Sequence, residues 1–207
     1  MGPGEFLRNQ FHFYRLWILE RLLRNDGVGT ENHSPAAVEL RFLDRHSRRD
    51  WICQHASDAD WPQFRAALQH DHDLVVASAA GQALGWAWIG YERVHLTPLG
   101  RSILLPPGTG YLYEAYVRPA ARRRGIGRAL VGARCLCARQ RGCDRLLTHV
   151  VEGNLPSLRA LQAHGFAITG RTHFVKALVV RMWTRSPLPA TLPAAGAAEP
   201  AAARAGT

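Results

Sequence analysis

Long apolar runs are missing from this sequence, although 47% of its 207 residues are hydrophobic. No stretch reaches the roughly 20 apolar residues that a membrane-spanning helix needs, and no secretory signal peptide is recognisable. A chain of this length and composition predicts one globular domain with peripheral extensions. We therefore expect a cytoplasmic protein without a membrane partner.

Cysteine is scarce as well, and its spacing argues against two kinds of site. Cys53, Cys135, Cys137 and Cys143 contain no Cys-x-x-Cys pair, which disfavours a zinc site and a disulfide framework. We predict buried free thiols. The run His70-Asp71-His72-Asp73 offers metal-ligating side chains, but it lies between a helical pattern and a strand, where we predict a solvated polar loop. We expect no metal.

The most informative pattern lies within residues 111–131, where an apolar, aromatic-rich strand runs into a glycine-rich turn and then a helical pattern. The turn reads Arg122-Arg123-Arg124-Gly125-Ile126-Gly127-Arg128. Such a turn directs free backbone N–H groups to one place, and the helix dipole adds partial positive charge there. Gly125 and Gly127 lack the Cβ atoms that would keep a phosphate from the backbone. The sequence therefore predicts a site for an anion such as a pyrophosphate.

Acidic residues are few, 16 against 26 basic ones, which gives a formal charge of +10 and a pI near 10.5. This charge is compatible with a basic surface or with binding to nucleic acid. Five arginines surround the predicted phosphate site: Arg118, Arg122, Arg123, Arg124 and Arg128. An anionic cofactor by itself needs this positive charge, so nucleic acid is the less favoured partner.

The pattern Arg-x-x-Gly-x-Gly resembles the acyl-CoA pyrophosphate loop of the GNAT superfamily of N-acetyltransferases. No Gly-Lys-Ser/Thr follows, which excludes a Walker loop, and Leu130 stands where a dinucleotide fingerprint has its third glycine. Residues 154–166 resemble the second motif of the superfamily, because Asn154 opens a predicted helix that ends at Gly165-Phe166. The resemblance rests on these two motifs in this order, about one βαβ unit apart.

The resemblance implies an α/β (α+β) fold, with a mixed, mostly antiparallel sheet that is flanked by helices and splayed at the acyl-CoA site. The order β-α-α-β-β-β-α-β-α-β-β over residues 38–183 fits it. We predict an N-terminal extension and linker over residues 1–37 and a disordered Ala/Pro-rich tail over residues 184–207. Within the extension, residues 10–24 fit a strand, a docked helix or an interfacial membrane helix.

The expected elements follow from hydrophobic periodicity and from turn residues. The predicted strands are 38–43, 74–78, 83–89, 111–117 and 144–151, with a closing hairpin of 166–170 and 173–182. The predicted helices are 44–56, 57–69, one from the turn to about residue 141, and 155–164. Residues 92–110 contain too many prolines and glycines for a long regular element.

The resemblance also implies acetyl-CoA as co-substrate and assigns its contacts. The strand around Ala115, Tyr116 and Val117 would pair with pantetheine, and the N–H of Tyr116 or Val117 would polarise the thioester carbonyl. The pyrophosphate would bind the amides of Arg123, Arg124, Gly125, Ile126, Gly127 and Arg128, with Arg122 beside them. Asn154 would bond the pantetheine arm, with Ser157 nearby, although Asn154 also fits an ordinary N-cap.

The catalytic groups are less defined. Glu114 is the predicted general base, acting through water, and the alternative is an ion pair with a neighbouring arginine. His149 and Glu152 are weaker candidates, since a histidine in an apolar strand is commonly a satisfied core residue. Leu161 stands where relatives often have a tyrosine as general acid. Either Tyr111, Tyr113 or Tyr116 replaces that acid, or the thiolate takes its proton from water.

These inferences predict an N-acetyltransferase that transfers an acetyl group from acetyl-CoA to the primary amine of a small molecule by direct attack. Segment 92–110 and the N-terminal segment would select the acceptor. The alternatives are a protein or peptide N-acetyltransferase and a non-catalytic acyl-CoA-binding module. Whether the protein forms a homodimer is left open.

Overall fold

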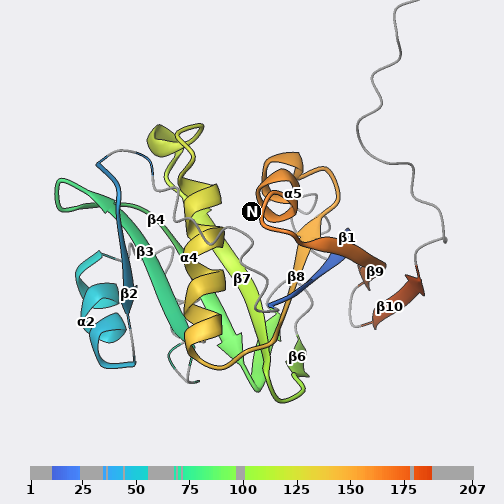
Figure 1. Cartoon of the computed structure of the whole chain (residues 1–207). Coiled ribbons are helices and arrows are strands. Elements are labelled where there is room, and N and C mark those ends of the chain that lie inside the picture. Colours follow the sequence, from blue (N-terminus) through green and yellow to red (C-terminus); the bar gives the residue numbers. More distant parts are fainter. Residues whose placement is uncertain are drawn as a thin grey trace, which may run out of the picture.

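An eight-stranded sheet forms the centre of the protein, and helices pack on it (Figure 1). The computed structural model describes residues 11–23, 35, 37–43, 45–55, 68, 70, 72–96, 101–177 and 180–187. These ranges contain the strands β1 (Phe11–Leu22), β2 (Glu39–Leu43), β3 (Asp73–Ala79), β4 (Gln82–Tyr91), β5 (Arg93–Leu96), β6 (Arg101–Leu104), β7 (Thr109–Val117), β8 (Arg145–Val151), β9 (Ala167–Ala177) and β10 (Val180–Pro187). The helices in them are α2 (Arg45–His55), α4 (Ile126–Gln140) and α5 (Leu155–Gln162), with a 3₁₀ turn, η2, at Pro119–Ala121.

The sheet is mixed and mostly antiparallel, which confirms the predicted fold class. Its strands follow the order β10-β9-β1-β8-β7-β4-β3-β2, and β5 pairs with β6 in a separate hairpin. Among the described strands, β7 and β8 are the parallel neighbours, and the other pairs are antiparallel. A parallel pair needs a crossover between its strands, and α4 provides it.

Strand β1 lies inside the sheet, between β8 and β9, and pairs with both. Residues 11–22 are therefore a strand, the first of the three readings that their sequence allowed. They are the part of the predicted N-terminal extension, residues 1–37, that joins the sheet. The reason is burial: Leu16 and Leu19 are almost completely enclosed, so the segment contributes to the core.

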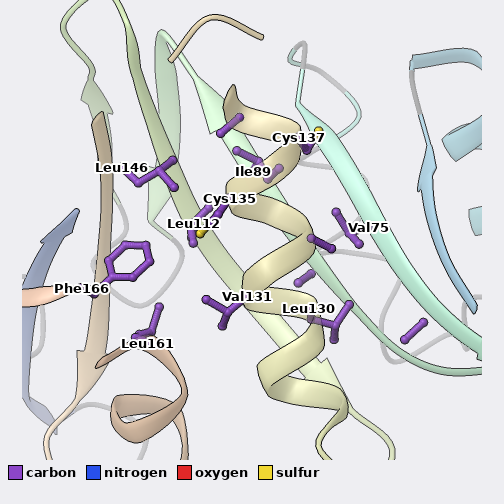
Figure 2. Close-up of a cluster of buried hydrophobic side chains, with 14 of the residues drawn as sticks. Val75, Ile89, Leu112, Leu130, Val131, Cys135, Cys137, Leu146, Leu161 and Phe166 are labelled. Atoms are coloured by element: carbon purple, nitrogen blue, oxygen red, sulfur yellow. The ribbon is translucent and has the colours of Figure 1, made fainter. Parts of the chain in front are cut away.

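The central strands β3, β4 and β7 bury residues on both faces of the sheet, as expected for strands covered on both sides. On one face, α4 packs against Val75, Ile89 and Leu112, and Leu161 of α5 belongs to the same cluster beside Phe166 (Figure 2). On the other face, α2 and the β5–β6 hairpin pack against a cluster that includes Leu74 and Trp88. None of the helices in the described ranges is long and apolar enough to cross a membrane.

Most of the predicted elements are confirmed to within a few residues: the β3–β4 hairpin, β2, α2, β7, α4, β8 and α5. The closing hairpin is displaced, because β9 continues to Ala177 where it pairs with β1 along its length. Strand β10 ends at Pro187, so residues 184–187 are not part of a tail. The predicted helix at 57–69 lies almost wholly outside the described residues, as do residues 24–34 of the linker and residues 188–207.

The cysteines are free thiols, and three of them, Cys135, Cys137 and Cys143, are buried as predicted. Cys53 is exposed, which corrects the prediction for that residue. Its neighbour Ile52 faces the core, and one residue further along a helix points to another side.

Candidate functional site

The parallel strands β7 and β8 separate half-way along their length. They pair only over residues 109–112 and 145–148, whereas β7 continues to Val117 and β8 to Val151. The outer edge of each strand stays paired, with β4 and β1 respectively. Beyond this point the two inner edges face each other with backbone groups that an extended ligand can pair with.

A β-bulge marks the point of separation. The pairing of β7 with β4 shifts between Trp86 and Trp88, so Glu114 and Ala115 together oppose a single residue of β4. Glu114 has a φ of 42°, in the left-handed region that residues with a Cβ adopt at a cost. A bulge bends its strand and redirects side chains, and here Ala115 and Tyr116 are exposed.

The turn between β7 and α4 presents a run of unpaired backbone N–H groups. Arg123 and Gly125 have left-handed φ values of 63° and 78°, and Gly125 is the N-cap of α4. The N–H of Ala129 bonds to the carbonyl of Gly125 at 3.0 Å. Within the described part of the chain, the N–H groups of residues 123–128 donate to no acceptor. Consecutive free amides at the positive end of a helix form an anion-binding concavity.

Two arginines of this region hold the end of β7 in place. Arg118 Nε donates to the carbonyl of Ala83 at 2.7 Å, and its guanidinium lies 5.7 Å from the ring centre of Trp86. Arg122 Nε donates to the carbonyl of Val117 at 3.2 Å. Arg122 therefore has a structural role beside the predicted one. The other arginines of the turn are exposed and add positive potential to it.

Asn154 is the N-cap of α5, as the structural alternative predicted. Its side-chain oxygen accepts from the N–H of Ser157 at 3.3 Å. Its NH₂ group donates to no residue in the described part of the chain, so it stays available for a ligand. The structure thus places Asn154 and Ser157 together at the start of α5, directly after the open end of β8.

The two motifs that carry the sequence resemblance thus form an amide-lined helix start ahead of α4 and a capped helix start at α5, beside the open strand edges, and sequence comparison agrees. The model of the Acetyltransferase (GNAT) family matches residues 40–166, more than half of the chain. The chain belongs to the GNAT acetyltransferase family.

Related proteins support this assignment. The chain is 27% identical to a mycothiol acetyltransferase of Salinispora tropica, over 73% of this chain and 51% of that protein. It is 30% identical to the protein of the same name from Salinispora arenicola, over 70% and 44%. The chain thus spans about half the length of the curated relatives it matches. A GCN5-related N-acetyltransferase from Sphaerobacter thermophilus shares the fold, with 14% identity, a TM-score of 0.50, and coverage of 89% of this chain and 55% of that chain.

The structure separates the candidates for acid–base chemistry. Glu114 lies half-buried at the bulge, beside the open edge of β7. Glu152 pairs with Arg171 at 3.3 Å and with Arg15 at 3.7 Å, and these contacts give its carboxylate a structural role. Leu161 is buried against the core near Phe166 (Figure 2), and its position offers no acid.

Two phenol–imidazole pairs lie close to the bulge, and the sequence did not predict either. The hydroxyl of Tyr113 lies 2.6 Å from His72 Nδ1, and His72 Nε2 lies 2.9 Å from the carbonyl oxygen of Arg93. The hydroxyl of Tyr111 lies 2.8 Å from His149 Nδ1. Burial raises the pKa of both tyrosines and lowers the pKa of His149 to about 4. For the pair of Tyr111 and His149, the sequence signal was a histidine in one apolar strand and several tyrosines in another.

The run that begins at His70 is not the solvated loop that we predicted. His72 and Asp73 are buried, because β3 begins within the run and carries both into the interior. Asp73 accepts from Arg141 Nη2 at 2.6 Å and from the hydroxyl of Tyr91 at 2.9 Å. These bonds fix the C-terminal end of α4, far from the turn. No group of three potential metal ligands occurs among the described residues.

Proposed function

We propose that the protein is an acetyl-CoA-dependent N-acetyltransferase that acts on the primary amine of a small molecule. The observation that carries this proposal is the combination of the open edges of β7 and β8 with the unpaired N–H groups ahead of α4. An extended pantetheine arm pairs with an open strand edge, and a pyrophosphate binds at a helix N-terminus. Because the turn follows β7 in the chain, a single ligand that contains a pantetheine arm and a pyrophosphate fits the strand edge and the helix start together.

The roles of the cofactor-binding residues follow from this placement. The backbone of Ala115, Tyr116 and Val117 pairs with pantetheine, and the N–H of Tyr116 or Val117 polarises the thioester carbonyl. The amides of residues 123–128 hold the pyrophosphate. Asn154 donates its free NH₂ group to the arm from the β8 side.

The transfer itself needs few additional groups, because positioning supplies much of the rate. The amine attacks the thioester carbon, the new C–N bond forms, and the C–S bond breaks as CoA leaves as a thiolate. Glu114, through a water molecule, takes the proton that the amine loses. The thiolate takes its proton from solvent, because Leu161 cannot supply one.

Two observations support a small acceptor, and a third supports a cytoplasmic location. The sequence relatives carry names that specify mycothiol, which is a small molecule. The β5–β6 hairpin lies in segment 92–110 and packs on the face of the sheet opposite α4, so it borders the side from which an amine would approach. The four free thiols are compatible with a reducing compartment.

A thiol-release screen tests the proposal. Purified protein and acetyl-CoA are mixed with glucosamine, kanamycin, free amino acids and a short peptide with a free N-terminus and a lysine, and released CoA is measured with a thiol reagent. We expect tight binding of acetyl-CoA by calorimetry and thiol release with at least one small amine. Release with the peptide alone would support a peptide acetyltransferase. Binding without any release would support an acyl-CoA-binding module.

A further inference from the structure

Tyr111 and His149 form a hydrogen-bonded pair at the closed end of the opening between β7 and β8. The pairing of these strands ends at Leu112 and Thr148, so His149 is the first residue of β8 beyond it. The Tyr111 hydroxyl and His149 Nδ1 are 2.8 Å apart. The pair therefore links the two strands at the place where they part.

The protons of this pair can be assigned from burial. Tyr111 is buried, and His149 Nδ1 is the one hydrogen-bond partner of its hydroxyl among the described residues. A buried hydroxyl that donates to nothing is costly, so Tyr111 donates and Nδ1 accepts. The neutral imidazole then carries its proton on Nε2.

The Nε2 atom of His149 differs from that of His72. His72 uses Nδ1 toward Tyr113 and Nε2 toward the carbonyl of Arg93, so both of its nitrogens serve the fold. Nε2 of His149 makes no hydrogen bond in the described part of the chain. This Nε2 atom is not fully enclosed, and the His149 side chain is only half-buried. Its N–H is therefore accessible to a ligand.

His149 lies on the face of the sheet from which an amine must approach. Leu147, two residues earlier on β8, packs against the cluster that contains Tyr111, and alternate residues of a strand share a face. Helix α4 and its turn cover the other face. A cofactor that is held at the turn presents its thioester through the opening, toward the face of His149.

We propose that His149 is a catalytic residue of the acetyl transfer, whose Nε2–H donates a hydrogen bond to the negative charge that develops on the thioester during attack. Tyr111 is the positioning residue that fixes the imidazole and its tautomer. This donor acts beside the backbone N–H of Tyr116 or Val117, and the leaving thiolate still takes its proton from solvent. This inference rests on the proposed function.

The electrostatics of the pair agree with a donor role rather than a base role. Burial lowers the pKa of His149 to about 4, so the imidazole is neutral at neutral pH. An efficient base would have a pKa closer to the working pH, whereas a neutral imidazole can donate to a developing oxyanion.

Two substitutions of His149 distinguish the roles of its two ring nitrogens. The amide of His149→Asn lies near the place of Nδ1, whereas the longer His149→Gln brings an NH₂ group near the place of Nε2. With the amine that gives the fastest thiol release, we expect kcat to fall about 10²- to 10³-fold in His149→Asn, as for the loss of one oxyanion donor. His149→Gln should retain most of kcat, Tyr111→Phe should lie between the two, and the Kd for acetyl-CoA should stay unchanged in all three.

The outcomes are distinct. Equal kcat values for His149→Asn and wild type, or equal losses for Asn and Gln, overturn the donor role and leave the proposed function intact. A loss of acetyl-CoA affinity that parallels the loss of rate would show a structural role instead. If His149→Asn does not fold, an unchanged kcat in Tyr111→Phe overturns the positioning role. Wild-type protein that acetylates none of the amines overturns the proposed function and this inference with it.

Discussion

Replacing Gly127 by alanine should separate the stability of the fold from binding of the cofactor. Gly127 is the second residue of α4, and its φ is not left-handed. An added Cβ would lie 4.0 Å from Val117 Cγ2, an ordinary van der Waals contact. Alanine is favoured over glycine in a helix by up to about 1 kcal/mol. The variant should therefore be as stable as wild type or melt about 2–4 °C higher.

Acetyl-CoA binding should change in the opposite direction. The Cβ of the variant would project from the exposed surface where the free N–H groups of residues 123–128 lie. If it prevents one amide from reaching the pyrophosphate, the lost charge-assisted hydrogen bond is worth about 1.5–3 kcal/mol. This corresponds to an increase in Kd of about ten- to a hundred-fold. Thermal melting and isothermal titration calorimetry measure the two effects on the same sample.

A matched control lies beyond the other end of the same helix. Gly142 has a left-handed φ of 77°, and no atom lies within 4 Å of the position its Cβ would take. Gly142→Ala should therefore lose about 1–2 kcal/mol of stability through backbone strain and bind acetyl-CoA normally. Wild-type affinity in Gly127→Ala would refute the placement of the pyrophosphate at this turn.

Three further predictions concern other parts of the molecule. Glu114→Gln should lower the acetylation rate about 10²- to 10⁴-fold with little change in acetyl-CoA affinity, and normal turnover at neutral pH would remove Glu114 from the mechanism. Asp73→Asn should destabilise the fold by about 1–3 kcal/mol in urea titrations, because Arg141 and Tyr91 lose a charged partner, and unchanged stability would show that the network is dispensable. The pKa of His149 is lowered from 6.5 to about 4, so the unfolded state takes up the proton first as pH falls. Wild type should therefore lose stability relative to His149→Gln between about pH 6.5 and pH 4, and parallel stability curves would contradict this.

The sequence predicted the parts of the site that depend on local residue order. A strand, a glycine-rich turn and a helix are specified by neighbouring residues, and the structure forms them where expected from β7 to α4. The cap at Asn154 was equally readable, because a cap involves residues three apart in the chain. These elements contain most of the predicted cofactor contacts.

The parts that the sequence did not predict depend on pairing between distant segments. Residues 11–22 contain both helical and strand signals, and only the neighbouring strands β8 and β9 decide in favour of a strand. The burial of His72 and its bond to Tyr113 join residues 41 positions apart. The bond between Tyr111 and His149 depends on the register of β7 and β8, which no local pattern specifies.

The position of β1 in the sheet has a consequence for folding during synthesis. Leu22 pairs with Arg145, and the rest of β1 pairs with residues that are translated later still. At ribosomal rates of about 5–20 residues per second, β1 waits roughly 6–25 s for its partners. During that time an aromatic-rich segment with two unpaired edges is exposed, and such edges are prone to associate with other chains. A chaperone that binds this segment early would therefore raise the yield of folded protein without any effect on the stability of the finished sheet.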